Sequence, residues 1–249
     1  MERRDALRAV TALTLGTVAG CSPTSGTPSS PAVPAGTPGS ARPAGPASPP
    51  LPDEVRNGPR DRPQIALTFH GQGDPRIVTA LLDELRRGHA RVTVLAVGTW
   101  LAANHDLGRR VLADGHDLGN HTQHHANIKT MKPPLAYAEI RDCAQEVHAV
   151  TGSIGRWFRP SQTRYATPTI KEAARRAGYP TCLSYDVDPL DFTDPGSAAI
   201  VSATLAAARP GSIVSLHCGH EGTVAAIAPL LAGLRARGLR PVTATDLFG

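Results

Sequence analysis

Two hydrophobic periods alternate along the chain from residue 64 onward. Short apolar runs of the buried-strand type are followed by longer segments in which apolar residues recur every three or four positions, as on one face of a helix. The first pair is a strand at residues 65–69 and a helix at residues 75–87. The apolar positions of that helix are Ile77, Val78, Leu81, Leu82 and Leu85. The pattern therefore predicts strands and helices in regular succession.

This succession continues to the C-terminus. Further strands are expected at residues 91–97, 118–121, 157–158, 181–185, 212–216 and 241–243. Further helices are expected at residues 101–113, 135–150, 168–177, 198–208 and 223–237. About six or seven strand–helix units favour an α/β fold, a parallel (β/α) barrel with its helices outside. In such a barrel, the residues that perform chemistry lie at the carboxyl ends of the strands.

The first 20 residues have the pattern of an export signal. Arg3, Arg4 and Arg8 precede an apolar stretch that is too short to cross a bilayer, and small residues lead up to Cys21. This pattern resembles a bacterial lipoprotein signal, and an ordinary secretory signal with an incidental cysteine is the alternative. We therefore expect an extracytoplasmic protein that is anchored to the cell membrane by a lipid on Cys21. Export would use the Sec route or, as Arg3-Arg4 suggests, the twin-arginine (Tat) route.

Residues 21–62 are rich in Pro, Ser, Gly, Thr and Ala and contain few large apolar residues. A segment of this composition buries too little surface to offset the entropy that is lost on ordering, so it is predicted to be a flexible tether. The chain is thus divided into a signal peptide at residues 1–20, a tether at residues 21–62 and a folded domain at residues 63–249.

Composition narrows the classes of function. Hydrophobic residues make up 41% of the 249 residues, which is compatible with a substantial core. The net charge of +5 is spread without Lys/Arg runs or interleaved aromatic residues, so we exclude nucleic acid as a partner. No Gly-x-Ser-x-Gly segment is present, and serine hydrolase chemistry is not supported. We expect a monomer with at most one disulfide among Cys143, Cys182 and Cys218.

Three histidines lie at or just after the end of the third predicted strand, namely His121, His124 and His125. His121 and His125 are four residues apart, so on a helical turn their imidazoles would lie on one face and could bind one divalent metal ion. The alternative is a polar, solvated loop. Other polar residues recur at the predicted carboxyl ends of the strands, and this recurrence favours the metal site. They include His70, Arg159, Asp188, Asp191 and His217.

Residues 63–249 carry five ordered motifs that resemble those of the polysaccharide deacetylases, the family with the NodB homology domain that is also called carbohydrate esterase family 4. Members of this family have a distorted (β/α) barrel and remove acetyl groups from N-acetylated sugars in peptidoglycan, chitin or related polymers. They use a divalent metal ion, usually zinc. The resemblance therefore implies a distorted (β/α) barrel, a divalent metal cofactor, with zinc expected, and an N-acetylated cell-wall glycan as the substrate.

The second and fifth motifs match closely. The metal-binding motif His-Ser/Thr-x-x-His is met by residues 121–125, which implies that His121 and His125 bind the metal. The motif Leu-x-His, or a close variant of it, resembles residues 215–217. This likeness implies that His217 acts as the general acid.

The third and fourth motifs match in part. Residues 158–160 meet only the first part of the motif Arg-x-Pro-aromatic, and the aromatic residue is absent. Residues 188–192 resemble the Asp-rich fourth motif. From the residue types, we expect Arg159 to support the site through a bidentate pair to Asp188 or Asp191, and a purely structural pair is the alternative.

The first motif departs from the family pattern. The family has Thr-Phe-Asp-Asp-Gly-Pro, in which the first Asp is the general base and the second binds the metal, whereas this chain has His70 and Gly71 at those positions. His70 could accept a proton from water or bind the metal, and Asp74 could supply the third metal ligand. Alternatively, His70 is hydrogen-bonded at the end of the barrel, and Asp74 caps the helix that begins at Pro75.

Three hypotheses on function follow. The first is a hydrolase in which a metal ion at His121 and His125 activates a water molecule, His70 takes the proton of that water, and His217 protonates the leaving amine. The second is a catalytically degenerate protein that keeps the barrel and its groove as a glycan-binding or scaffold module. A different amide hydrolase built on the same barrel is a third candidate.

Overall fold

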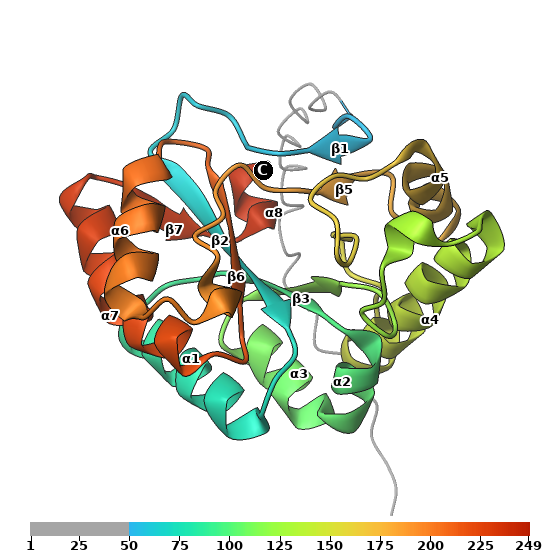
Figure 1. Ribbon diagram of the computed structural model, residues 1–249, viewed down its shortest axis with the longest axis horizontal. Coiled ribbons are helices and arrows are strands. Elements are labelled where there is room, and N and C mark those ends of the chain that lie inside the picture. The colour runs from blue at the N-terminus through green and yellow to red at the C-terminus, as the bar shows by residue number, and fades with distance from the viewer. Residues whose placement is uncertain (1–49) are drawn as a thin grey trace, which may run out of the picture. The chain divides into compact units, whose positions relative to one another are not determined.

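Strand β2, Gln64–Gly71, lies at the centre of the fold (Figure 1). The structure, a computed structural model, describes residues 50–249. The other strands are β1 Glu54–Val55, β3 Thr93–Ala96, β4 Asp117–Asn120, β5 Cys182–Leu183, β6 Ile213–His217 and β7 Arg240–Val242. The helices are α1 Pro75–Arg87, α2 Gly98–Ala103, α3 His105–Ala113, α4 Pro133–Thr151, α5 Pro168–Arg176, α6 Ser197–Ala207, α7 Glu221–Ala236 and α8 Ala244–Leu247. Two 3-10 helices are η1 Ile128–Thr130 and η2 Asp191–Thr193. The predicted signal peptide and Cys21 lie outside the described residues.

The sheet is parallel and has the order β4-β3-β2-β6, and β7 also pairs with β2. Beyond β4 it continues through single bridges, first from Asn120 to Phe158 and then from Phe158 to Cys182. The segment that contains β5 then crosses to β6, where Val187 bridges Val214. This circuit of strands, with helices outside it, is a distorted (β/α) barrel, as predicted. It is distorted because one side is held by single bridges and a two-residue strand instead of full ladders.

Strand β2 is buried on both faces, which is typical of a central parallel strand. Ile65, Leu67 and Phe69 pack in the cluster that includes the apolar faces of α1 and α7. The side chain of Ala66 points to the opposite face of the strand and packs with Leu95 in the cluster inside the barrel. The alternation of side chains along the strand thus joins two layers of core and directs the last residues of β2 to the carboxyl edge of the barrel.

Helix α1 begins where the sequence predicts, because Asp74 caps it and Pro75 occupies its first turn. The helix predicted at residues 101–113 is instead two helices, α2 and α3. The break is at Asn104, whose side-chain amide donates a hydrogen bond to the carbonyl of Trp100 at 2.8 Å. Hydrophobic spacing continues across this break, so the pattern alone did not reveal it.

The predicted boundary at residue 63 needs correction, because residues 51–62 belong to the folded unit. Strand β1 pairs in parallel with β5, and Val55 is buried. Arg60 forms an ion pair with Asp186 at 2.8 Å, and Arg62 donates a hydrogen bond to the carbonyl of Leu247 at 2.9 Å. The amino-acid composition of residues 51–62 did not predict this packing, because the segment is held to the barrel by backbone pairing and ion pairs and contributes few apolar side chains.

Cys143, Cys182 and Cys218 are buried free thiols, so residues 50–249 contain no disulfide. Burial raises the pKa of the Cys143 and Cys182 thiols to about 12, which keeps them protonated and unreactive. None of the helices within the described range has the length and apolar character that a membrane span requires.

Candidate metal centre and active site

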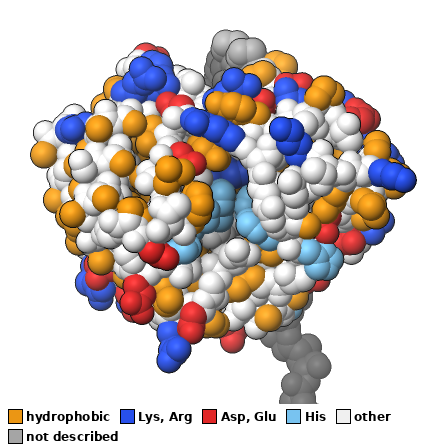
Figure 2. Space-filling model, viewed as in Figure 1, with side chains coloured by type: hydrophobic (Ala, Val, Ile, Leu, Met, Phe, Trp, Pro, Cys, Tyr) orange, Lys and Arg blue, Asp and Glu red, His pale blue; other side chains and the backbone are white. Residues whose placement is uncertain are grey.

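Three imidazoles meet at the carboxyl edge of the barrel. His70 is near the end of β2, His121 follows β4, and His125 lies in the loop beyond it. One ligand nitrogen from each side chain lies within 4.8 Å of the others. Figure 2 shows a hollow in this face, with histidine side chains inside it and Lys or Arg side chains along its upper rim. The trio has the donor set of a three-histidine metal site.

The loop of residues 121–125 brings the imidazoles together without forming a helical turn. Thr122 has a φ of 69° and His125 a φ of 55°, both in the left-handed region. The Thr122 amide donates to the side-chain oxygen of Asn120 at 2.9 Å, and Gln162 donates to the His125 carbonyl at 2.8 Å. A β-branched residue in this region is strained, and such strain concentrates at functional sites. The helical-turn geometry predicted for His121 and His125 is therefore wrong, although their rings do meet, with centroids 5.0 Å apart.

His121 is oriented so that one ring nitrogen is free. Its Nδ1 lies 2.9 Å from the carbonyl oxygen of Arg159. Because a carbonyl oxygen only accepts, Nδ1 carries the hydrogen and Nε2 keeps its lone pair. This Nε2 is buried and has no hydrogen-bond partner among the described residues. A buried lone pair without a partner, held by a hydrogen bond on the opposite nitrogen, fits a metal ligand.

The protonation state of the trio also fits metal binding. Burial, together with the neighbouring imidazoles, holds the pKa of both His70 and His121 well below the usual value. Burial and His217 lower the pKa of His125 as well. All three rings are therefore neutral near pH 7, and neutral imidazole is the form that binds metals.

Gly71, which stands where the family has its metal-binding Asp, leaves no room for a side chain. A Cβ at this position would lie 2.8 Å from Cγ1 of Val94 and 3.0 Å from Cα of Ala96. Strand β3 thus fills the space that a ligand side chain would need. The third nitrogen comes from His70, whose ring centroid lies 4.2 Å from that of His121.

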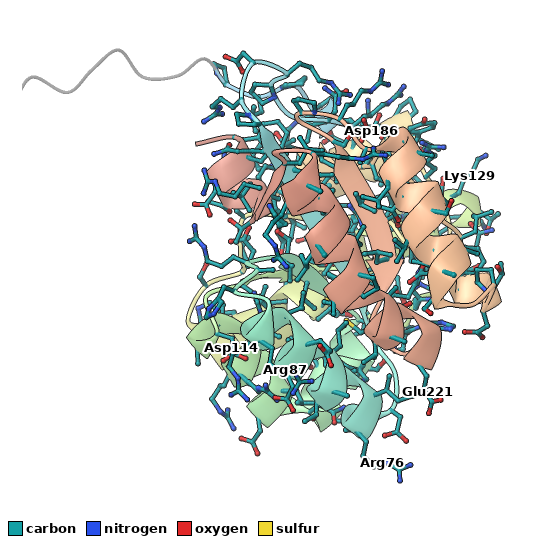
Figure 3. The ribbon with its side chains drawn as sticks, turned by 90° about the vertical axis from the view of Figure 1, so that its left-hand side faces the viewer. Arg76, Arg87, Asp114, Lys129, Asp186 and Glu221 are labelled. Atoms are coloured by element: carbon teal, nitrogen blue, oxygen red, sulfur yellow. The ribbon has the colours of Figure 1, made fainter. Side chains whose placement is uncertain are left out.

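Asp74 does not join the trio, which corrects its prediction as a metal ligand. Its Oδ1 accepts the backbone N–H of Arg76 at 2.8 Å, and its Oδ2 accepts the guanidinium of Arg76 at 3.0 Å. Arg76 points outward from the start of α1 (Figure 3). The carboxylate is therefore committed to capping the helix at the surface, which is the alternative considered from the sequence.

His217 and Asp191 form a second unit beside the trio. His217 Nδ1 lies 2.8 Å from Oδ1 of Asp191, and the His217 backbone N–H donates to Oδ2 at 2.8 Å. Thr223 Oγ1 also donates to Oδ2 at 2.6 Å, and Asp191 is fully buried. Asp191 therefore fixes the imidazole with Nδ1 protonated and Nε2 available. The His217 ring centroid lies 4.3 Å from that of His70.

Arg159 does not form the predicted pair with Asp188 or Asp191. Its Nε donates to the carbonyl of Leu183 at 2.8 Å and its Nη2 to that of Ser184 at 3.4 Å, while Nη1 is buried without a partner in the described part of the chain. Burial lowers the pKa of the guanidinium to about 9. Asp191 is unavailable because His217 and Thr223 occupy it. Arg159 instead binds the end of β5 through its guanidinium. Through its own carbonyl it also orients the ring of His121.

A pocket of about 340 Å³ opens over both units and includes Asp188 in its lining. Its walls contain residues that the sequence reasoning did not assign, namely Gln162, Arg164, Tyr185, Phe192 and Ser215. Tyr185 and Ser215 lie at or near predicted strand ends, so the carboxyl-end rule could have found them. Arg164 lies in a loop without a motif, and only the tertiary structure brings it here.

Comparison with known proteins places the chain among relatives of known family. The sequence profile of the family described as polysaccharide deacetylase matches residues 57–182. A peptidoglycan-N-acetylglucosamine deacetylase of Bacillus cereus is 33% identical over 200 residues, which cover 76% of this chain and 90% of the relative. A chitooligosaccharide deacetylase of a Bradyrhizobium species is 30% identical over 70% of this chain and 85% of the relative.

The same fold occurs in a CE4 family pseudoenzyme from Bacillus anthracis, with a TM-score of 0.74 over 79% of this chain and 69% of that protein at 20% identity. The profile covers half of the chain and the Bacillus cereus relative covers three quarters of it. With its barrel, its strand-end histidines and these two matches, the chain belongs to the polysaccharide deacetylase family, carbohydrate esterase family 4.

Proposed function

We propose that this protein is a metal-dependent hydrolase that removes N-acetyl groups from a cell-wall glycan. The observation that carries the proposal is the convergence of three neutral imidazoles, one of them with a buried free nitrogen, beside the pair of His217 and Asp191 in one pocket. The two relatives are named as deacetylases of peptidoglycan and of chitooligosaccharides, and this supports the substrate class.

His70, His121 and His125 would hold the metal ion. A set of three imidazoles favours zinc, which when bound polarises a carbonyl group and lowers the pKa of water. This choice takes His70 as a ligand instead of the general base, because its ring is neutral and shares the site of the other two imidazoles.

His217 then carries out both proton transfers. Water adds to the acetyl carbon, the carbon–nitrogen bond of the amide breaks, and the products are acetate and a free sugar amine. Nε2 of His217 accepts the proton of the water and returns it to the leaving nitrogen. Asp191 stabilises the imidazolium that forms in between, since its carboxylate already accepts the hydrogen on Nδ1.

Export and anchoring remain part of the proposal. The lipoprotein signal that we infer for residues 1–20 would attach the protein through Cys21 to the cell membrane, next to the glycan. We propose that it works there as a monomer.

The test combines metal analysis with acetate release from peptidoglycan and from chitin oligomers. We expect about one divalent ion per chain in the wild type, and acetate from at least one glycan. His121→Ala should lose both the metal and the activity, because one of three protein ligands is removed.

His124→Ala is the matched control. His124 belongs to the same loop, but its exposed ring is bonded to Glu139 at 2.7 Å, and it is not among the three residues whose ligand nitrogens lie together. This variant should keep both metal and activity. A wild-type protein that binds no divalent ion, or that releases no acetate from either glycan, would contradict the catalytic proposal.

A second candidate is a glycan-binding module without turnover. It is favoured by His70 and Gly71, which replace both acids of the first motif. Metal binding together with glycan binding, but without acetate release, would support it.

A further inference from the structure

We propose that Arg164 recognises a carboxylate on the glycan, so that this protein prefers an acidic N-acetylated glycan to a neutral one. The inference rests on the proposed function for the location of the glycan, and it narrows the substrate class. It concerns the wall of the pocket and not the metal-binding residues.

Arg164 lines the pocket without an acidic partner. Its Nη2 donates to the backbone carbonyls of Asp186 at 3.0 Å and Tyr185 at 3.5 Å. No carboxylate in the described residues lies within ion-pair distance of it. Carbonyl groups satisfy only part of a guanidinium, which has five N–H donors, so donors remain for a ligand.

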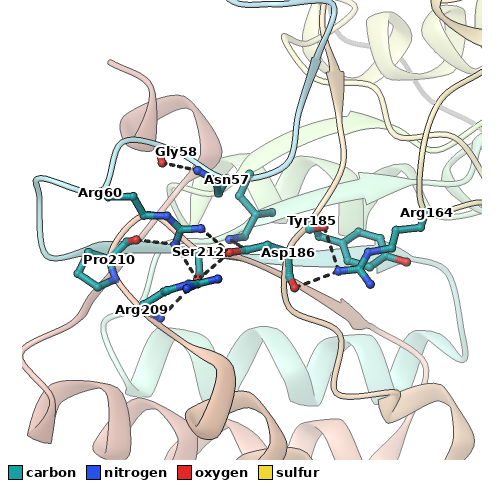
Figure 4. A network of polar contacts seen from close by, with 10 residues as sticks. Asn57, Gly58, Arg60, Arg164, Tyr185, Asp186, Arg209, Pro210 and Ser212 are labelled. Carbon is teal, nitrogen blue, oxygen red and sulfur yellow. Dashed lines mark hydrogen bonds and ion pairs between the residues drawn. The ribbon is translucent and has the colours of Figure 1, made fainter. Parts of the chain in front are cut away.

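Asp186, whose backbone carbonyl accepts a hydrogen bond from Arg164, has a carboxylate that is turned to other partners. Its carboxylate accepts hydrogen bonds from Arg60 at 2.8 Å, from the hydroxyl of Ser212 at 3.1 Å and from the backbone of Ile213 at 2.7 Å. Figure 4 shows this network on one side of Asp186 and Arg164 on the other, bonded to the main chain. Arg60, and not Arg164, therefore neutralises Asp186.

Two tyrosines hold the Arg164 side chain in place. Its guanidinium carbon lies 5.0 Å from the ring centroid of Tyr185 and 5.5 Å from that of Tyr165. Arg56 covers Tyr165 at 4.0 Å. Cation–π contacts of this kind orient a planar cation without neutralising its charge. A cation held in advance loses less entropy when it binds an anion.

Arg164 forms no ion pair with the acid of the pocket. Asp188 is the carboxylate in the pocket lining, and it is engaged by the backbone N–H of Leu190 at 3.0 Å and by the Tyr185 hydroxyl. A carboxylate on the ligand can thus form charge-assisted hydrogen bonds with Arg164 through its Nη1 group, because only Nη2 is bonded to the main chain.

This chemistry separates two classes of glycan. Neutral chains of N-acetylglucosamine have no group for Arg164, whereas glycans that carry lactyl or peptide carboxylates do. Since the relatives include deacetylases named for both classes, Arg164 provides a basis in this chain for choosing between them.

Binding of two matched disaccharides tests the proposal. The probes are N-acetylglucosaminyl-N-acetylmuramic acid and the same disaccharide with its carboxylate converted to a carboxamide, measured by calorimetry on the mature protein. The wild type should bind the carboxylate about tenfold more tightly. Arg164→Gln should remove this preference, and Arg164→Lys should keep part of it, because Lys retains the charge and loses the planar fork.

Arg176→Gln is the matched control. Its guanidinium also lies over a tyrosine, 4.5 Å from the ring centroid of Tyr137, but it is outside the pocket, so the preference should be unchanged. Equal binding of the two probes by the wild type, failure to bind either, or an equal loss in the two Gln variants would overturn the proposal. Because binding needs no turnover, a preference without acetate release would refute the catalytic proposal and leave the role of Arg164 standing.

Discussion

At His121, one hydrogen bond decides what the imidazole can do. The carbonyl of Arg159 accepts a hydrogen bond from Nδ1, and the opposite nitrogen, Nε2, remains buried with a free lone pair. His124, three residues away, bonds to Glu139 at the surface and has no such nitrogen. The motif already distinguishes these two histidines by spacing. The choice between His70 and Asp74 as third ligand was open in the sequence, because it depends on where a turn and a helix cap direct each side chain.

The lowered pKa values predict acid sensitivity in the metal-free protein. An unfolded histidine titrates near pH 6.5, whereas folded His70 and His121 titrate well below their usual range because they are buried. Between these values the unfolded chain binds more protons, so stability is complete above about pH 7.5 and falls as the pH drops below about 6.5. Each residue contributes up to about 1.4 kcal/mol per pH unit.

Urea unfolding of the metal-free protein between pH 5 and pH 8 measures this slope. His121→Asn should reduce it, since one of the two buried groups no longer titrates. A free energy of unfolding that stays constant from pH 7.5 to pH 5.5 would show that these imidazoles are not buried in neutral form.

At the scale of elements, caps and breaks account for most differences from the predicted pattern. Helix α1 has the predicted bounds because its cap, its first-turn proline and its apolar face all indicate the same segment. The predicted helix over α2 and α3 lacked a signal for its break, since Asn104 acts through its own side chain. Local sequence signals were sufficient to predict the bounds of a helix where they agreed. They were insufficient where a single side chain ended the helix.

Asp74→Ala separates the capping role from the ligand role. If Asp74 only caps α1, the variant should lose about 2–4 °C in melting temperature, the effect of removing one helix cap in a domain of this size. Its metal content should not change. Asp106→Ala, at an exposed position in the first turn of α3, is a control that should alter neither quantity by more than a small amount. Loss of metal in Asp74→Ala would restore Asp74 as a ligand.

At the scale of the molecule, closure of the barrel depends on segments with weak sequence signals. Phe158 and the stretch around β5 join β4 to β6 by single bridges, and β1 adds to β5 from the N-terminal side. These contacts position Tyr185 and Asp188 in the wall of the pocket and Arg159 in the buried layer next to them. The irregular side of the barrel is therefore also the side that supplies the walls of the site.

Two deletions test where the domain begins. Removal of residues 22–49 should leave the melting temperature unchanged, because that composition buries little surface. Removal of residues 22–62 should lower it by about 5 °C or more, since the burial of Val55 and the pairing of β1 are lost. Equal melting temperatures for the two deletions would return the boundary to residue 63.

The sequence by itself determined the order of strands and helices, the α/β class and the strand ends that carry chemistry, because periodicity and motif spacing are local properties of the chain. It also identified His121, His125 and His217 through the family resemblance. Only the tertiary structure decided that His70 joins the trio, that Asp191 serves His217 instead of Arg159, and that Arg164 faces the pocket. Those outcomes depend on which groups from distant segments lie within hydrogen-bonding distance in the folded chain. Neither periodicity nor spacing along the chain contains that information.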